Sequence, residues 1–142
     1  MKRLLTILVV LMLSVSLVAC GKTASDGGPE DNMYADGAVI QVKEKEITKT
    51  FTVEILDKDQ NLTTVTVKTD LKTVGEALQQ ADLLYGEQGE YGLYIKTVNG
   101  ITADYEKDGM YWAFYIDGEY AMTGVDMTES ADGAVYRFAV EK

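Results

Sequence analysis

The chain has 142 residues, with 13 Lys and Arg against 23 Asp and Glu, and it contains one Cys, one Trp and no His. The resulting net charge of −10 argues against a nucleic-acid partner, because phosphate binding needs clustered Lys and Arg. Without His, a hydrolytic triad and an imidazole-ligated metal are excluded, and no spacing singles out a catalytic pair of acids. We therefore expect a protein that is not an enzyme, with no catalytic residues, no metal ligands and no cofactor.

The N-terminus has the pattern of an export signal. Lys2 and Arg3 precede an apolar run over residues 4–18, which is shorter than the roughly 20 residues of a membrane-spanning helix. The run ends in L-V-A-C, which resembles the lipobox of bacterial lipoproteins, where the cysteine is lipidated and becomes the new N-terminus. A catalytic thiol or a disulfide at Cys20 would need a His or a second Cys. We expect residues 1–19 to be a signal peptide and the mature protein to be exported and lipid-anchored at the cell membrane or cell surface.

A polar tether follows the cysteine. The chain from Gly21 to about Gly37 is rich in Gly, Ser, Asp and Glu, carries the single Pro and has almost nothing to bury. Residues 38–49 fit either a strand or a linker, since three apolar residues come before the solvated run K-E-K-E. We expect a tether over residues 20–49 and one folded domain over residues 50–142.

The folded part begins with a predicted hairpin. Residues 51–55 alternate between apolar and polar side chains, which is the period of a half-buried strand. After the turn D-K-D-Q-N, residues 62–69 are rich in Thr and Val and predict a second strand.

One short helix follows the hairpin. Thr73 and Glu76 have the spacing of a capping box, in which each side chain binds the backbone N–H of the other. Apolar residues then recur on one helical face, so Leu78 and Ala81 should pack on the sheet while Gln79 and Gln80 face water. We expect this helix to end near Leu84.

Three more strands are predicted over residues 91–98, 110–117 and 134–140, with turns at Asn-Gly and Asp-Gly pairs between them. The order of hairpin, helix and strands indicates the α+β class. It most easily builds a β-grasp-like fold, which is a small mixed sheet with one helix packed across it.

Two acidic turns resemble the start of a calcium loop. They are D-K-D-Q-N at residues 57–61 and D-Y-E-K-D-G at residues 104–109. The twelfth position, where a calcium loop has a bidentate Glu, is Lys68 in the first frame and Tyr115 in the second. We interpret both segments as polar turns.

Aromatic side chains concentrate in Y-W-A-F-Y-I, residues 111–116. On a strand, Trp112 and Phe114 point to one face, while Tyr111 and Tyr115 point to the other. One helix covers only one face of the sheet, so the tyrosine face should stay partly open, and Tyr94 on the preceding strand can join it. Two interpretations remain for each group. Trp112 is either a core anchor or a ligand contact, and the tyrosines form either cross-strand pairs or a binding surface.

Four segments together resemble the transcobalamin-like C-terminal domain family. They are T-V-G-E-A-L at residues 73–78, Y-G-L-Y-I-K-T-V-N-G-I at 91–101, Y-W-A-F-Y-I-D-G-E-Y-A-M-T-G-V at 111–125 and G-A-V-Y-R-F at 133–138. This family is a domain of uncharacterised function in bacterial lipoproteins and surface proteins. It is similar to the smaller domain of the vertebrate cobalamin carriers, which holds cobalamin against a larger helical domain.

The resemblance implies a site for a flat ligand such as cobalamin or another corrinoid. It places contacts on residues 90–95, on Trp112 and on residues 120–124. The helical partner domain does not occur in this chain, so a partner protein supplies the second half of the clamp or the ligand is a different one. The alternative is a protein-interaction or adhesive module without a small-molecule ligand. With the open-face tyrosine included, the candidate ligand-binding residues are Tyr91, Leu93, Tyr94, Trp112, Tyr115, Tyr120, Met122, Thr123 and Gly124.

Overall fold

The computed structural model describes residues 33–42 and 49–142. The expected signal peptide, Cys20 and most of the expected tether lie outside these residues. Within the described part of the chain, no helix has the length and apolar character needed to cross a bilayer.

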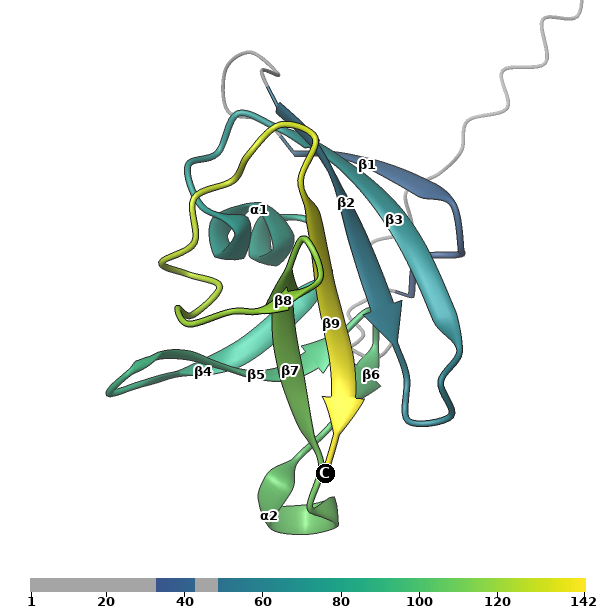
Figure 1. Ribbon diagram of the computed structural model, residues 1–142, viewed down its shortest axis with the longest axis vertical. Coiled ribbons are helices and arrows are strands. Elements are labelled where there is room, and N and C mark those ends of the chain that lie inside the picture. Colours follow the sequence, from purple (N-terminus) through teal and green to yellow (C-terminus); the bar gives the residue numbers. More distant parts are fainter. Residues whose placement is uncertain (1–32, 43–48) are drawn as a thin grey trace, which may run out of the picture.

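The larger of two β-sheets has six strands in the order β1-β3-β2-β9-β7-β8 (Figure 1). Strands β2 and β3 form the predicted antiparallel hairpin, and β9 pairs with β2 in parallel. The sequence left open whether residues 38–49 form a strand or a linker. Residues 38–42 form strand β1, which pairs in parallel with β3 and extends the sheet N-terminal to residue 50. The six strands are β1 (Ala38–Val42), β2 (Lys49–Leu56), β3 (Leu62–Thr69), β7 (Tyr111–Ile116), β8 (Glu119–Tyr120) and β9 (Val135–Glu141).

The smaller sheet is antiparallel and contains β4 (Leu84–Gly89), β5 (Gly92–Val98) and β6 (Ile101–Thr102). In Figure 1 its strands β4 and β5 run across the direction of β7 and β9. The α+β class is confirmed, and so are the predicted strands at β5, β7 and β9. The expectation of a single sheet is wrong, because β4 was not predicted and gives β5 a partner outside the larger sheet.

Helix α1 (Val74–Gln80) begins as predicted and ends earlier than predicted. Both hydrogen bonds of the Thr73–Glu76 capping box are present. The helix stops because Asp82 takes a left-handed conformation with φ of 55°. The N–H groups of Asp82 and Leu83 then donate to the carbonyls of Gln79 and Leu78, which is the hydrogen-bond pattern of a Schellman motif.

The core lies between the six-stranded sheet and the layer formed by α1 and the smaller sheet. Leu78 and Ala81 are buried in it, while Gln79 and Gln80 are exposed, as predicted for the two faces of the helix. The rings of Phe114 and Phe138 stack with their centroids 5.0 Å apart, and Phe51 meets Tyr136 edge to face. This packing fixes β7, whose buried face also forms part of the site described below.

The N-terminal segment before β1 ties the two sheets together. The backbone N–H of Tyr34 donates to Oδ1 of Asn99, and Nδ2 of Asn99 donates to the carbonyl of Tyr34. The Tyr34 hydroxyl donates to the carbonyl of Ala81 at the end of α1. Asn99 lies in the turn between β5 and β6, while β1 itself belongs to the larger sheet.

Candidate functional site

A cavity of about 250 Å³ lies where β5, β7 and the loop after β8 meet, and we call it the aromatic groove. Strand β5 contributes one wall, the buried face of β7 contributes the second, and the chain after the β7–β8 hairpin contributes the third. Every side chain that lines it is uncharged. The lining residues are Leu93, Tyr94, Ile95, Trp112, Phe114, Tyr120, Ala121, Met122, Thr123, Gly124 and Val125.

Most of the residues singled out from the sequence meet in this groove, although they come from three separate segments. Those that line it are Leu93, Tyr94, Trp112, Tyr120, Met122, Thr123 and Gly124. Tyr91 and Tyr115 do not. Tyr91 lies in the turn between β4 and β5 and is 90% exposed. Tyr115 lies on the opposite face of β7, where its hydroxyl donates to Glu141, and its ring meets Tyr120 edge to face with centroids 5.5 Å apart.

The expected position of Tyr94 was wrong. The sequence suggested that it would join Tyr111 and Tyr115 on one open face of a common sheet. Instead, β5 belongs to the smaller sheet, and Tyr94 lines the groove together with Trp112. Phe114 and Val125 line the groove but were not named, while Ile95 and Ala121 were included only within the ranges 90–95 and 120–124. The alternation that put Phe114 on the same face as Trp112 could have identified it, but no local signal marks Val125.

Trp112 is both a core residue and a wall of the groove. Its side chain is only 6% exposed, and its ring has buried neighbours in the main hydrophobic core. Its indole Nε1–H is buried and has no hydrogen-bond partner among the residues that the structure describes. A buried donor without a partner costs about 1–3 kcal/mol, so such groups are rare in folded proteins.

The third wall is held in place by hydrogen bonds to neighbouring elements. The N–H of Ala121 donates to the carbonyl of Phe114 on β7. Farther along, the N–H of Gly75 donates to the carbonyl of Val125, and Val74 donates to Thr128 in the same way. These two donors belong to the first turn of α1, where N–H groups have no partner inside the helix. The loop therefore caps the helix, and the helix in turn fixes the wall of the groove.

The rim of the groove carries exposed apolar side chains. Met122 is 93% exposed, and Tyr94 and Tyr120 are also exposed. Lys96 places its Nζ 5.4 Å from the centroid of the Tyr94 ring and forms an ion pair with Asp104 at 3.4 Å. The cation beside the groove is thus already paired, and the open surface offers mainly apolar and aromatic contact.

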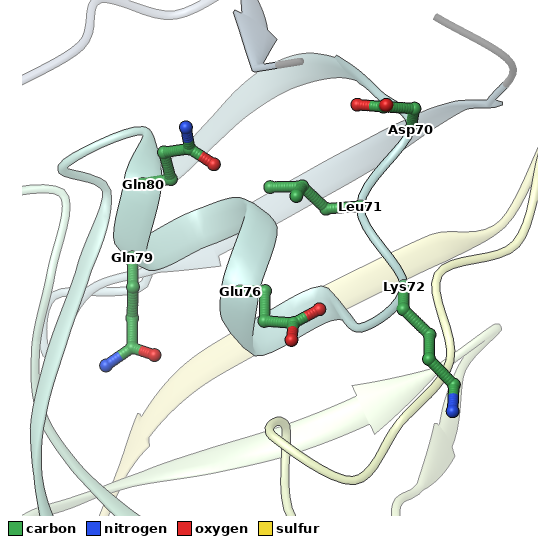
Figure 2. A pocket seen from close by; sticks show the side chains of 6 residues that line it. All are labelled: Asp70, Leu71, Lys72, Glu76, Gln79 and Gln80. Atoms are coloured by element: carbon green, nitrogen blue, oxygen red, sulfur yellow. The ribbon is translucent and has the colours of Figure 1, made fainter. Parts of the chain in front are cut away.

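A larger hollow of about 560 Å³ lies beside α1 (Figure 2). Its lining is mostly polar and charged, which is less typical of a ligand site than the lining of the aromatic groove. The hollow beside α1 is lined by Asp70, Leu71, Lys72, Glu76, Gln79 and Gln80. In Figure 2 the long side chains of Lys72 and Gln79 extend away from Leu71 rather than toward a common point. The carboxylate of Glu76 is engaged in the capping box. Ligand sites are mostly apolar with a few convergent polar groups, and the aromatic groove fits that description better.

The two acidic turns hold their carboxylates in hydrogen bonds of their own. Asp57 accepts from the backbone N–H groups of Asp59 and Asn61, which closes the β2–β3 turn. Asp104 caps the short helix α2 (Tyr105–Asp108) by accepting from the N–H of Glu106. Over residues 33–42 and 49–142, no group of three or more His, Cys, Asp or Glu side chains is placed to hold a metal ion.

The chain resembles several solved structures and matches one protein family. No curated protein matches the chain. The crystal structure of a protein from Ruminococcus gnavus ATCC 29149, described as a candidate metal-binding protein, superposes with a TM-score of 0.63 and 36% sequence identity, over 67% of this chain and 98% of that one. Haptocorrin in complex with Cbi superposes with a TM-score of 0.46 and 21% identity, over 70% of this chain and 27% of that one, which is too distant to transfer any property. Residues 72–142 match the family model described as a domain of unknown function (DUF4430), and the chain therefore belongs to this family.

Proposed function

We propose that the chain is an exported, lipid-anchored binding protein, without catalytic activity, whose aromatic groove holds the edge of a flat ligand. The observation that carries the proposal concerns Trp112, which lines the groove. Its indole N–H is buried and has no acceptor among the described residues. A bound molecule with an acceptor at its edge would satisfy this donor, and the surrounding rings would cover its apolar surface.

A corrinoid such as cobalamin is the ligand that we propose to test. The support is the resemblance of the sequence to the transcobalamin-like family, whose implied contacts fall largely on the residues that line the groove. The β-grasp-like arrangement is part of the same proposal, supported by the β2–β3 hairpin, α1 and the parallel pairing of β2 with β9. A ligand that brings its own metal ion would also agree with the metal-binding description of the Ruminococcus gnavus protein.

The size of the groove sets the expected affinity. At about 250 Å³ it is smaller than the roughly 300–1,000 Å³ of ordinary ligand pockets, so it encloses only part of a corrinoid. The remainder of the ligand would lie over the exposed rim or against a partner protein that supplies a second half. We expect the isolated protein to bind with a dissociation constant of about tens of micromolar or weaker, which corresponds to about −6 kcal/mol.

The second candidate is a protein-interaction or adhesive module. Its specific support is Met122, which lines the groove and is 93% exposed, together with the exposed rings of Tyr94 and Tyr120, because large apolar side chains gathered on one surface mark contact sites for other proteins. In this case the groove would receive side chains of a partner rather than a small molecule.

The discriminating experiment uses Trp112, which is the only tryptophan, as a reporter. Full-length protein in detergent is titrated with cyanocobalamin, and the ¹H–¹⁵N resonance of the indole is followed. We expect a saturable shift, weakened by Tyr94→Ala and Tyr120→Ala with little change in Tm. Tyr105→Ala, an exposed tyrosine of α2 that does not line the groove, is the control. No saturable shift up to millimolar concentration would sink the corrinoid proposal and favour the interaction module.

A further inference from the structure

A further hollow of about 420 Å³ adjoins the aromatic groove at the β7–β8 hairpin, and we call it the hairpin hollow. It shares three lining residues with the groove, so the chain at the end of β8 and just after it forms one side of both. The shared residues are Tyr120, Ala121 and Met122, and the hairpin hollow is completed by Ile116, Asp117 and Glu119.

The groove and the hairpin hollow follow the same face of β7. Side chains alternate along the strand, so Ile116 lies on the face that carries Trp112 and Phe114. Glu119 is directly opposite Ile116 in the β7–β8 pairing, and side chains that are directly opposite in an antiparallel pair lie on the same face. A row of three apolar side chains therefore leads out of the groove and ends beside an acidic one.

The groove and the hairpin hollow differ in charge. The groove is lined by uncharged side chains, whereas the hairpin hollow contains two carboxylates, and none of the described residues that line either one is Lys or Arg. Asp117 is partly engaged, because its Oδ1 accepts from the N–H of Val135. Glu119 is exposed, and over residues 33–42 and 49–142 its carboxylate forms no ion pair. Asp126 lines neither space, so Glu119 is the acid best placed to meet a ligand that extends from the groove.

We propose that the aromatic groove and the hairpin hollow form one site, whose ligand places a flat apolar ring in the groove and a positively charged group beside Glu119. No base in the lining offsets the two carboxylates, so a cation is attracted there and an anion is repelled. The hairpin hollow also brings the site into the usual size range of ligand pockets, which the groove alone does not reach. This inference rests on the proposed function, because it assumes that the groove holds a flat ligand, and it adds the charge of the part that lies outside the groove.

Four small probes test length and charge separately. 4-Phenylbutylamine is the cation, 4-phenyl-1-butanol is its neutral counterpart, 5-phenylpentanoate is the anion on the same four-carbon chain, and benzylamine is a short cation. The step from Phe114 to Ile116 is about 7 Å in a strand, which a four-carbon chain covers and the single carbon of benzylamine does not. Each probe is titrated to millimolar concentration into full-length protein in a non-ionic detergent at low salt. The indole resonance of Trp112 reports on the groove, and a methyl resonance of Ile116 reports on the hairpin hollow.

The expected order of affinity is amine, alcohol, carboxylate. 4-Phenylbutylamine should shift both resonances and bind about two- to fivefold more tightly than the alcohol, because exposed charge pairs contribute only modestly. Benzylamine should shift the resonance of Trp112 more than that of Ile116. Added salt should reduce the advantage of the amine, since it screens exposed charges.

Variants of Glu119 test where the preference arises. Glu119→Gln should remove most of the advantage of the amine, and Glu119→Lys should reverse the order, so that 5-phenylpentanoate binds better than the amine. Glu106→Gln is the matched control, because it removes the same charge at an exposed position of α2 that lines neither space. The probes enter the detergent to the same extent for every variant, so a difference between variants reports on the protein.

Different failures have different meanings. If the amine, the alcohol and the carboxylate bind equally while they shift the Trp112 resonance, the cation site is wrong and the groove remains a ligand site. If Glu119→Gln and Glu106→Gln reduce the preference for the amine equally, the cation site is also wrong, because the attraction then comes from the charge of the whole protein. Selectivity among the probes without any response to cyanocobalamin overturns the corrinoid alone and supports the extended site. A Trp112 resonance that responds to none of the four probes and not to cyanocobalamin overturns the extended site and the proposed function together.

Discussion

Tyr111 and Tyr115 share one acceptor on the face of β7 opposite the groove. Both hydroxyls donate to the carboxylate of Glu141 on β9. The hydrogen bond to Glu141, with smaller contributions from burial and from the negative charge of that carboxylate, raises the pKa of Tyr115 to about 12. Tyr115 points away from the groove because side chains alternate along β7, and on that opposite face its ring contacts Tyr120.

The raised pKa predicts a loss of stability at high pH. The pKa of Tyr115 is higher in the folded protein than the value of about 10 in an unfolded chain, so the proton is held more tightly when the protein is folded. The stabilisation is complete below about pH 10 and is lost as the pH rises through the folded value. Glu141→Gln should move the Tyr115 titration toward lower pH, measured by near-ultraviolet absorbance against Tyr115→Phe. A titration unchanged by Glu141→Gln but shifted by Glu119→Gln would contradict this account.

The position of a single side chain could be predicted where it depends only on neighbouring residues in the sequence. Alternation along β7 placed Trp112 and Phe114 on one face, and both are buried. Asp126 carried no such signal, because its surroundings depend on Gly92 and Gly75, which lie 34 and 51 positions earlier in the sequence. Only the fold brings these glycines together, and the sequence alone shows an ordinary acidic residue in a loop.

At the level of elements, α1 shows which boundary signals a sequence carries. Its start was readable because Thr73 and Glu76 make the capping box through side chains. Its end was not, because a left-handed residue after a helix is usually Gly, and here it is Asp82. Strand β4 was missed for a similar reason. Its sequence L-Y-G-E-Q-G lacks alternation, and it contains a bulge at Gly86, where a Cβ would lie 2.3 Å from the carbonyl oxygen of Tyr94.

The orientation of α1 predicts that substitutions on its two faces differ in their effect on stability. Leu78 is fully buried against the sheet, whereas Gln80 is exposed. Leu78→Ala removes buried methyl groups and leaves a cavity, so it should lower the free energy of unfolding by about 2–5 kcal/mol. Gln80→Ala should change it by less than about 0.5 kcal/mol. Denaturant unfolding of both variants measures the difference, and equal losses would mean that the helix presents a different face to the sheet.

At the scale of the whole molecule, the groove exists because two sheets cross. The order of elements predicted the α+β class. The same order is compatible with all the predicted strands forming one sheet, with the helix packed across it. The second sheet forms through β4, and Tyr34 and Asn99 then join its turn to the segment before β1. Tyr94 and Trp112 meet only through this arrangement, so the sequence could name most of the residues of the groove without showing how they come together.

The charge of the mature protein bears on how it attaches to a membrane. Removal of residues 1–19 takes away two bases and no acids, which leaves 11 basic and 23 acidic side chains and a net charge of −12. Such a charge does not attract a chain to an anionic lipid surface. The proposed anchor is therefore the lipid at Cys20 rather than charge.

Cys20→Ala should abolish incorporation of a labelled fatty acid. The protein should then appear either as a longer precursor, held in the membrane by the apolar run at residues 4–18, or as a released chain, and gel mobility with fractionation separates these two forms. Ser25→Ala, in the expected tether, is the control and should keep both the label and the membrane attachment. Acyl label that persists in Cys20→Ala would end the lipoprotein proposal, because the chain has no second cysteine to carry it.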